Sequence, residues 1–182
     1  MISFLLYVKI RREFYGEDVK IERKRIEEVL YMRRKDRERD REFAFMVVDK
    51  CEYAVLSVID TEGKPYGVPI SIARQGEVIY FHCAKEGKKA DAVRKHREVC
   101  ISCVGDTKRE EDKFTTKYES AILFGTAEEV TQEEEKIMAL RLLCERHTPT
   151  NMGNFDKAVE QSLARTAVWK IQINGITGKC KE

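Results

Sequence analysis

The sequence predicts an α+β protein built on a barrel of six antiparallel strands with flanking helices. Several short segments alternate apolar and polar residues with a period of two, which is typical of strands. Turn residues such as those at 60–63 separate consecutive strands by only a few positions, so neighbouring strands run antiparallel. Few helical segments interrupt the strands, which disfavours a doubly wound parallel sheet.

The length and composition fit a single globular domain. The chain has 182 residues, of which 36% are charged and 42% hydrophobic, unlike a disordered or membrane-embedded protein. Its net charge of only +2 argues against nucleic acid as the main partner. The first residues lack the basic region and cleavage site of a signal peptide, and no apolar run is long enough for a bilayer. We therefore expect a cytoplasmic protein with no membrane partner.

Residues 1–31 are expected to be a charged extension to a domain that comprises residues 32–182. Residues 19–31 can form a helix, but the extension offers no recognisable chemistry. A purine-rich ribosome-binding sequence can encode residues 27–29 just before Met32. The extension is therefore either a non-native translated leader or a genuine segment that packs on the barrel.

The elements of the domain follow in a fixed order. A short apolar helix at residues 43–50 precedes three strands connected as a meander and a short helix. A fourth strand leads to a polar linker, expected to be a mobile loop, and to a longer fifth strand. Two helices then precede the sixth strand, and the first of these begins with the spacing of a capping box. The expected ranges are 53–59, 65–73 and 78–83 (strands), 87–95 (helix), 99–104 (strand), 105–117 (loop), 118–130 (strand), 131–148 and 154–164 (helices), and 166–173 (strand).

The six cysteines are expected to be free thiols, because the chain is not a small cysteine-rich secreted scaffold. Cys100 and Cys103 have the spacing of a metal-binding or redox pair. They lie in one strand, however, where an odd separation points the two sulfurs to opposite faces. No metal site is predicted.

The stretch from residue 79 to residue 95 carries the clearest chemical signal. A helix N-terminus presents unpaired backbone N–H groups and the positive end of the helix dipole, so it attracts anions. Gly87 permits close approach of the backbone, and Lys88 and Lys89 add two positive charges. This pattern indicates a phosphate site, and a solvated helix that bears lysines is the alternative.

Six segments, in this order along the chain, carry a resemblance to a known family. They are residues 32–37 (MRRKDR), 63–70 (GKPYGVPI), 79–84 (IYFHCA), 86–89 (EGKK), 118–127 (YESAILFGTA) and 165–171 (RTAVWKI). Together they resemble the nitroimidazole-reductase (Nim) branch of the pyridoxamine-phosphate-oxidase-like split barrels, which bind FMN. The resemblance covers residues 32–179.

The resemblance implies a homodimer that holds two FMN molecules at the subunit interface, with each flavin ring along residues 68–71. It also implies that His82 lies near the flavin, where an imidazole can deliver a proton; a packed structural histidine is the alternative. His96 and His147 are expected at the surface, and Trp169 in the core or the dimer interface. The implied cofactor contacts are Val68, Pro69, Ile70, Ser71, Phe81, His82, Cys83, Gly87, Lys88, Lys89 and Ser120.

The implied activity is that of an FMN-dependent oxidoreductase. It would pass electrons from a reduced nicotinamide to a small acceptor, such as a nitroimidazole or another nitroaromatic compound. Two alternatives are a flavin-binding dimeric module without turnover and a barrel that binds haem or a deazaflavin. Tyr66 and Ser71 stand where pyridoxamine-phosphate oxidase itself carries basic residues, and residues 178–182 lack its C-terminal arginine and histidine segment. Recognition of the vitamin substrate is therefore not expected.

Overall fold

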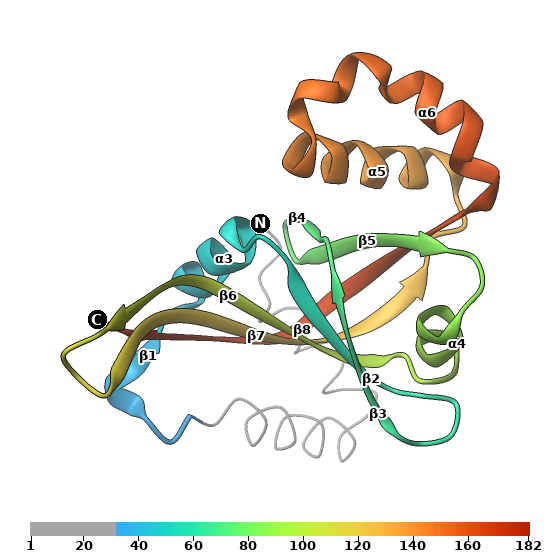
Figure 1. Cartoon of the computed structure of the whole chain (residues 1–182). Coiled ribbons are helices and arrows are strands. Elements are labelled where there is room, and N and C mark those ends of the chain that lie inside the picture. Colours follow the sequence, from blue (N-terminus) through green and yellow to red (C-terminus); the bar gives the residue numbers. More distant parts are fainter. Residues whose placement is uncertain (1–31) are drawn as a thin grey trace, which may run out of the picture. The chain divides into compact units, whose positions relative to one another are not determined.

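The computed structural model describes residues 32–182, and residues 36–182 form one compact unit (Figure 1). The extension of residues 1–31, with its expected helix, lies outside the described residues. None of the helices in the described part is long and apolar enough to cross a membrane.

Eight antiparallel strands form one sheet in the order β3-β2-β6-β7-β8-β5-β4, and the short β1 pairs with β8. The two ends of this order, β3 and β4, are consecutive in the chain and only Ser71 and Ile72 separate them. Because so short a link spans roughly 10 Å at most, the sheet must curl until its two edges approach each other. The strands are β1 (Glu38–Arg39), β2 (Ala54–Ile59), β3 (Pro65–Ile70), β4 (Ala73–Gln75), β5 (Val78–Ala84), β6 (Glu98–Glu110), β7 (Thr115–Glu129) and β8 (Thr166–Lys181).

The predicted fold class, an α+β antiparallel split barrel, is confirmed, with eight strands in place of six. One added strand is β1, which is too short to show an alternating pattern. The other arises because the strand expected at 65–73 breaks after Ile70 into β3 and β4, which lie at opposite ends of the strand order.

Helix α3 (Arg41–Lys50) covers one end of the barrel interior. Asp40 caps it by accepting a hydrogen bond of 2.8 Å from the backbone N–H of Phe43. Its buried face, which includes Ala44 and Val47, packs against the strands. A Cβ atom at Gly178 on β8 would lie 3.1 Å from the Cβ atom of Ala44, so a glycine lets the helix approach this strand.

The other helices are α4 (Lys88–Lys95), α5 (Glu133–His147) and α6 (Phe155–Ser162). Figure 1 shows α5 and α6 together beside β5. They enclose a second apolar cluster, in which Tyr80 and Val168 of the sheet meet Leu140 and Phe155 of the helices. The capping box expected at the start of α5 is absent, because Gln132 occupies the N-cap and no side chain bonds there.

The prediction of a mobile loop at residues 105–117 is wrong. Strands β6 and β7 continue through most of this stretch as a hairpin, with Arg109 opposite Thr116 and Glu110 opposite Thr115. Side chains on this extension are polar on both faces, so its sequence does not show the apolar alternation by which strands are recognised. Short strands extending beyond a core are stabilised by their backbone ladder and cross-strand pairs instead.

Strand β8 is also longer than expected, and it continues from residue 173 to Lys181. A bulge interrupts its pairing with β7, because Phe124 faces Gly175 while Gly125 faces Ile173. A Cβ atom at Gly125 would lie 2.5 Å from the carbonyl oxygen of Gln172, so only glycine fits at this crossing. Because the bulge interrupts the alternation of buried and exposed residues, the sequence pattern did not predict the second half of β8.

Candidate functional site

Helix α4 begins in open space without a capping side chain. Its N-cap, Gly87, has a φ of +120°, a conformation that favours glycine. A Cβ atom built at Gly87 would meet nothing within 4 Å. The N-terminal N–H groups of α4, which no side chain caps, are therefore accessible to an anion.

The two lysines at the start of α4 contact different elements. The Nζ atom of Lys88 lies 3.0 Å from Oδ2 of Asp60 and 4.9 Å from the ring centroid of Tyr66. The Nζ atom of Lys89 lies 5.7 Å from the ring centroid of Phe81. Lys88 thus already has an anionic partner, whereas the contact of Lys89 recorded in the described part of the chain is with the face of an aromatic ring.

Asp60, in the turn between β2 and β3, is a member of this site that the sequence pattern did not reveal. Its side chain is only 4% exposed, and it accepts backbone hydrogen bonds from Glu62 (2.9 Å) and Lys64 (2.8 Å). The bond from the Lys64 backbone, and then the contact with Lys88, lower the pKa of Asp60 from 3.8 to about 2. The only sequence signal is an aspartate at the start of a turn, which turns commonly contain.

The lowered pKa of Asp60 predicts a loss of stability in acid. A carboxylate with a depressed native pKa stabilises the fold above its ordinary pKa, and this contribution disappears as the pH falls from 3.8 towards 2. We expect Asp60→Asn to lower the Tm at pH 6 and to differ progressively less from the native sequence as the pH approaches 2. Thermal unfolding of both proteins by circular dichroism checks this, and a difference independent of pH would contradict it.

Strand β3 is an edge strand that leads away from the start of α4. Within residues 32–182 it pairs only with β2, and prolines occupy positions 65 and 69. Because a proline cannot donate to the ladder, these residues face the free edge. By alternation, the N–H and carbonyl groups of Gly67 face the same edge. This edge therefore offers one backbone donor and three carbonyl acceptors to a ligand.

The three predicted residues of β5 differ in exposure. Phe81 is fully buried and stacks on Trp169, with ring centroids 6.2 Å apart and an interplanar angle of 8°. Its side chain is therefore part of the core, and only its backbone is available to a ligand. Cys83 is half-buried and His82 is exposed on the other side of the strand. Surrounding protein atoms, and then the charges of Lys89 and His147, lower the pKa of His82.

His147, at the end of α5, was expected at the surface, but it is half-buried beside the site. Its Nε2 atom lies 2.9 Å from the carbonyl oxygen of Ile72. Because a carbonyl only accepts, Nε2 must carry the proton. His147 therefore holds the link between β3 and β4 next to Ser71. A helix end in the sequence gives no indication of this contact, which depends on how α5 packs.

Ser120 lies apart from the other predicted residues. Glu129 at the end of β7 bonds Arg94 of α4, and Ser120 is nine residues further back on the same strand. At about 3.3 Å per residue, roughly 30 Å separate Ser120 from that end. Figure 1 shows the β6–β7 hairpin at the end of the barrel opposite α4. Within one chain, Ser120 and the lysines do not share a site.

A cavity of about 810 Å³ lies near this hairpin, and none of the predicted site residues lines it. Its walls carry Arg37, Arg109 and Tyr118, and the side chain of Phe114 beside it is fully exposed. This hollow is separate from the start of α4, the edge of β3 and His82. Those three features form the candidate site, because there an open cationic helix end meets unpaired backbone groups.

Comparisons with known proteins agree with this architecture. A candidate 5-nitroimidazole antibiotic resistance protein from Bacteroides thetaiotaomicron is 25% identical, with a TM-score of 0.65 over 79% of this chain and 88% of that chain. A flavocytochrome from Azotobacter vinelandii is 22% identical, with a TM-score of 0.71 over 84% of this chain and 72% of that chain. An FAD and haem binding protein from Mycobacterium smegmatis is also 22% identical, with a TM-score of 0.67 over 79% and 72% of the two chains.

A comparison with curated protein sequences finds no match. The family model described as pyridoxamine 5′-phosphate oxidase, in contrast, matches residues 40–180. This range contains every strand from β2 to β7 and all of the candidate site, together with nearly the whole of β8. The chain therefore belongs to the pyridoxamine 5′-phosphate oxidase family.

Proposed function

We propose that this protein binds FMN and uses it to reduce a small acceptor, such as a nitroimidazole or another nitroaromatic compound, with a reduced nicotinamide as electron donor. The observation that carries the proposal is the open, uncapped start of α4, with Lys88 and Lys89, beside the free edge of β3. The family match and the likeness to a candidate nitroimidazole resistance protein support the choice of cofactor and acceptor.

The residues at the start of α4 fit the phosphate of FMN. A phosphate dianion needs several N–H donors and positive charge, and the uncapped N–H groups and two lysines supply both. Gly87 lets the anion approach, since the space where a side chain would stand is open. Lys89 would contribute more than Lys88, because Asp60 already offsets the charge of Lys88.

The free edge of β3 fits the polar edge of a flavin ring. Such a ring has both hydrogen-bond donors and acceptors, and the N–H of Gly67 and the carbonyls at 65, 67 and 69 can meet them. Bound flavin supplies the hydride chemistry, which the protein itself does not perform. Of the sequence-predicted contacts at residues 68–71, Pro69 offers its carbonyl at this edge and Ser71 is exposed, whereas the backbone groups of Val68 and Ile70 face β2.

In this proposal His82 delivers a proton to the acceptor. Its side chain is exposed on β5, and desolvation by surrounding protein atoms, followed by the charge of Lys89, lowers its pKa. A neutral imidazole near pH 7 can take a proton from solvent and pass it on as a nitro group is reduced. Surrounding protein atoms and the Lys89 charge would both favour the neutral form of His82, and the FMN phosphate would offset only the second effect.

A homodimer would bring Ser120 into the site from a second copy. On the outer face of the sheet, two rows of paired residues cross β3, β2, β6, β7 and β8 in that order. The first row consists of Pro69, Val55, Ser102, Ile122 and Thr177. The second row consists of Gly67, Ser57, Cys100, Phe124 and Gly175. No residue in these rows is charged, although 36% of the chain is. Ile122 is 39% exposed and neighbouring Val104 is 55% exposed. An uncharged, partly apolar face of this kind is typical of a protein interface.

A charge in the middle of this face is expected to prevent dimerisation. We predict that Ile122→Asp gives a folded monomer, because the side chain is exposed in the single chain but would be buried without a partner charge in the dimer. Light scattering after size-exclusion chromatography measures the mass, and Lys108→Asp on the exposed hairpin extension serves as the matched control. A native chain that is already monomeric would refute the dimer.

An absorption spectrum followed by a turnover assay tests the proposed function. Purified protein loaded with FMN should oxidise a reduced nicotinamide only when a nitroimidazole is added. The His82→Ala variant should catalyse this oxidation more slowly than the native protein. Protein that binds FMN without turnover would instead be a flavin-binding module. Protein that takes up haem or a deazaflavin, but no FMN, would disprove the proposed cofactor.

A further inference from the structure

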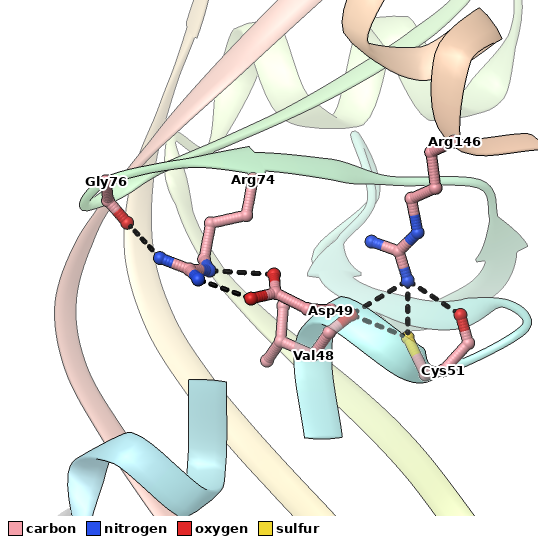
Figure 2. A network of polar contacts seen from close by, with 6 residues as sticks. All are labelled: Val48, Asp49, Cys51, Arg74, Gly76 and Arg146. Atoms are coloured by element: carbon pink, nitrogen blue, oxygen red, sulfur yellow. Dashed lines mark hydrogen bonds and ion pairs between the residues drawn. The ribbon is translucent and has the colours of Figure 1, made fainter. Parts of the chain in front are cut away.

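A second group of reactive residues lies where α5 meets the end of α3, apart from the proposed flavin site. Arg146, in the last turn of α5, directs its guanidinium group towards Cys51, the C-cap of α3 (Figure 2). Its Nη2 atom donates to the carbonyl oxygens of Val48 (2.8 Å) and Cys51 (2.7 Å) and lies 3.6 Å from the Cys51 sulfur. The thiol is thus in direct contact with a cation.

Arg146 has no carboxylate partner within ion-pair distance among residues 32–182. The nearby carboxylate, Asp49, is bound by Arg74 through both of its oxygens. Of the groups that Arg146 contacts, only the Cys51 thiol can become an anion. A half-buried cation in this position favours the thiolate form of Cys51.

Cys103 of β6 pairs with Ala54, three residues beyond Cys51, and the two buried thiols belong to one core cluster. The Cys51 thiol donates to the carbonyl oxygen of Val48 (3.3 Å). The neighbouring Cys103 thiol, opposed by burial and assisted by Arg146, lowers the pKa of Cys51, whereas Cys51 and burial raise the pKa of Cys103. Cys51 is therefore the thiol of the pair that loses its proton more readily.

We propose that Cys51 and Cys103 form a redox pair that a hydroperoxide converts into an intramolecular disulfide. The Cys51 sulfur attacks one peroxide oxygen, the O–O bond breaks, and the leaving hydroxide takes up a proton to form water. The Cys103 sulfur then attacks the Cys51 sulfenic acid, the S–O bond breaks, and a second water leaves with the Cys103 proton. Two thiols lose two electrons in total, and one hydrogen peroxide is reduced to two waters.

Burial makes this pair selective for a small oxidant. Cys51 is 3% exposed and Cys103 is 1% exposed, so bulky thiol reagents have no access in the folded protein. Cys100 is more exposed, but burial without a nearby cation raises its pKa. Cys51 should therefore react with peroxide before Cys100 does. A ranking of the two thiols by exposure alone would predict the opposite order. The pair needs no flavin, so the inference is independent of the proposed function.

Peroxide treatment of the reduced full-length chain tests the inference. After quenching with N-ethylmaleimide in denaturant, we expect a protein with two fewer adducts than the untreated chain, and a proteolytic fragment that joins Cys51 to Cys103. Dithiothreitol should restore both adducts. A wild-type protein that stays folded but forms no such link, or links other cysteines, would overturn the proposal.

Variants separate the roles of the three residues. Arg146→Gln should slow disulfide formation at least about tenfold, because it removes the cation that favours the thiolate, whereas Arg146→Lys should retain most of the rate. Cys103→Ser should stop the link and let Cys51 proceed to the sulfinic acid. Cys100→Ser is the matched control and should leave the rate unchanged. If Cys103→Ser does not fold, Cys51→Ser provides the same test, and a peroxide-induced link that persists in it refutes the pair.

Discussion

Replacing Lys88 and Lys89 together with alanine is expected to raise the Kd for FMN at least about a hundredfold. A hydrogen bond to a charged group contributes about 1.5–3 kcal/mol, and a tenfold change in Kd corresponds to about 1.4 kcal/mol. We expect the lower end of the combined range, because Asp60 already offsets the charge of Lys88. For the same reason, Lys89→Ala alone should account for most of the loss.

The measurement is a titration of FMN fluorescence, repeated with riboflavin, which lacks the phosphate. The lysine variants should bind riboflavin as the native chain does, since only the phosphate would contact α4. Lys85→Ala is the matched control, because Lys85 is exposed in the preceding loop but lies before the helix start. An unchanged affinity for FMN in the double variant would show that the phosphate binds elsewhere, and an equal loss of riboflavin would indicate general damage to the site.

Local patterns in the sequence were sufficient to predict the lysine-bearing start of α4. Gly87, Lys88 and Lys89 are consecutive, so their placement at a helix start follows from the helix boundary alone. The β2–β3 hairpin likewise follows from apolar alternation on either side of a turn. In each of these cases, the residues that decide the structure are neighbours in the chain. The three-strand meander was wrong, because the second strand breaks into β3 and β4, and β5 pairs with β4 and β8 but not with β3.

Features that depend on packing between distant segments were not predictable in this way. His147 and Arg146 are adjacent at the end of α5, yet one reaches Ile72 and the other Cys51, and only the docking of the helix decides this. Asp60 resembles any turn aspartate until Lys88 of the following helix is placed beside it. The hairpin at 105–117 was missed because its strands have no buried face, so backbone pairing replaced the apolar pattern.

Trp169 was expected in the core or in a dimer interface, and it is 2% exposed within the single chain. It lies on β8, between β5 and β7, where its ring stacks on Phe81 and Arg94 lies 5.7 Å from its centroid. Its indole Nε1 is buried without a hydrogen-bond partner in the described part of the chain. The contribution of this side chain to stability is therefore mainly its apolar volume.

We accordingly predict that Trp169→Ala lowers the free energy of unfolding by about 3–5 kcal/mol, because it leaves a large cavity beside Phe81. For a chain of this size, the Tm should fall by roughly 6–20 °C. Trp169→Phe should cost clearly less, since it keeps an aromatic ring against Phe81 and removes an N–H that bonds nothing. Urea unfolding followed by circular dichroism is the appropriate measurement, at one protein concentration and without flavin, because this is the only tryptophan and fluorescence disappears with it. Equal losses in the two variants would mean that the indole N–H, and not the stacked ring, contributes the stability.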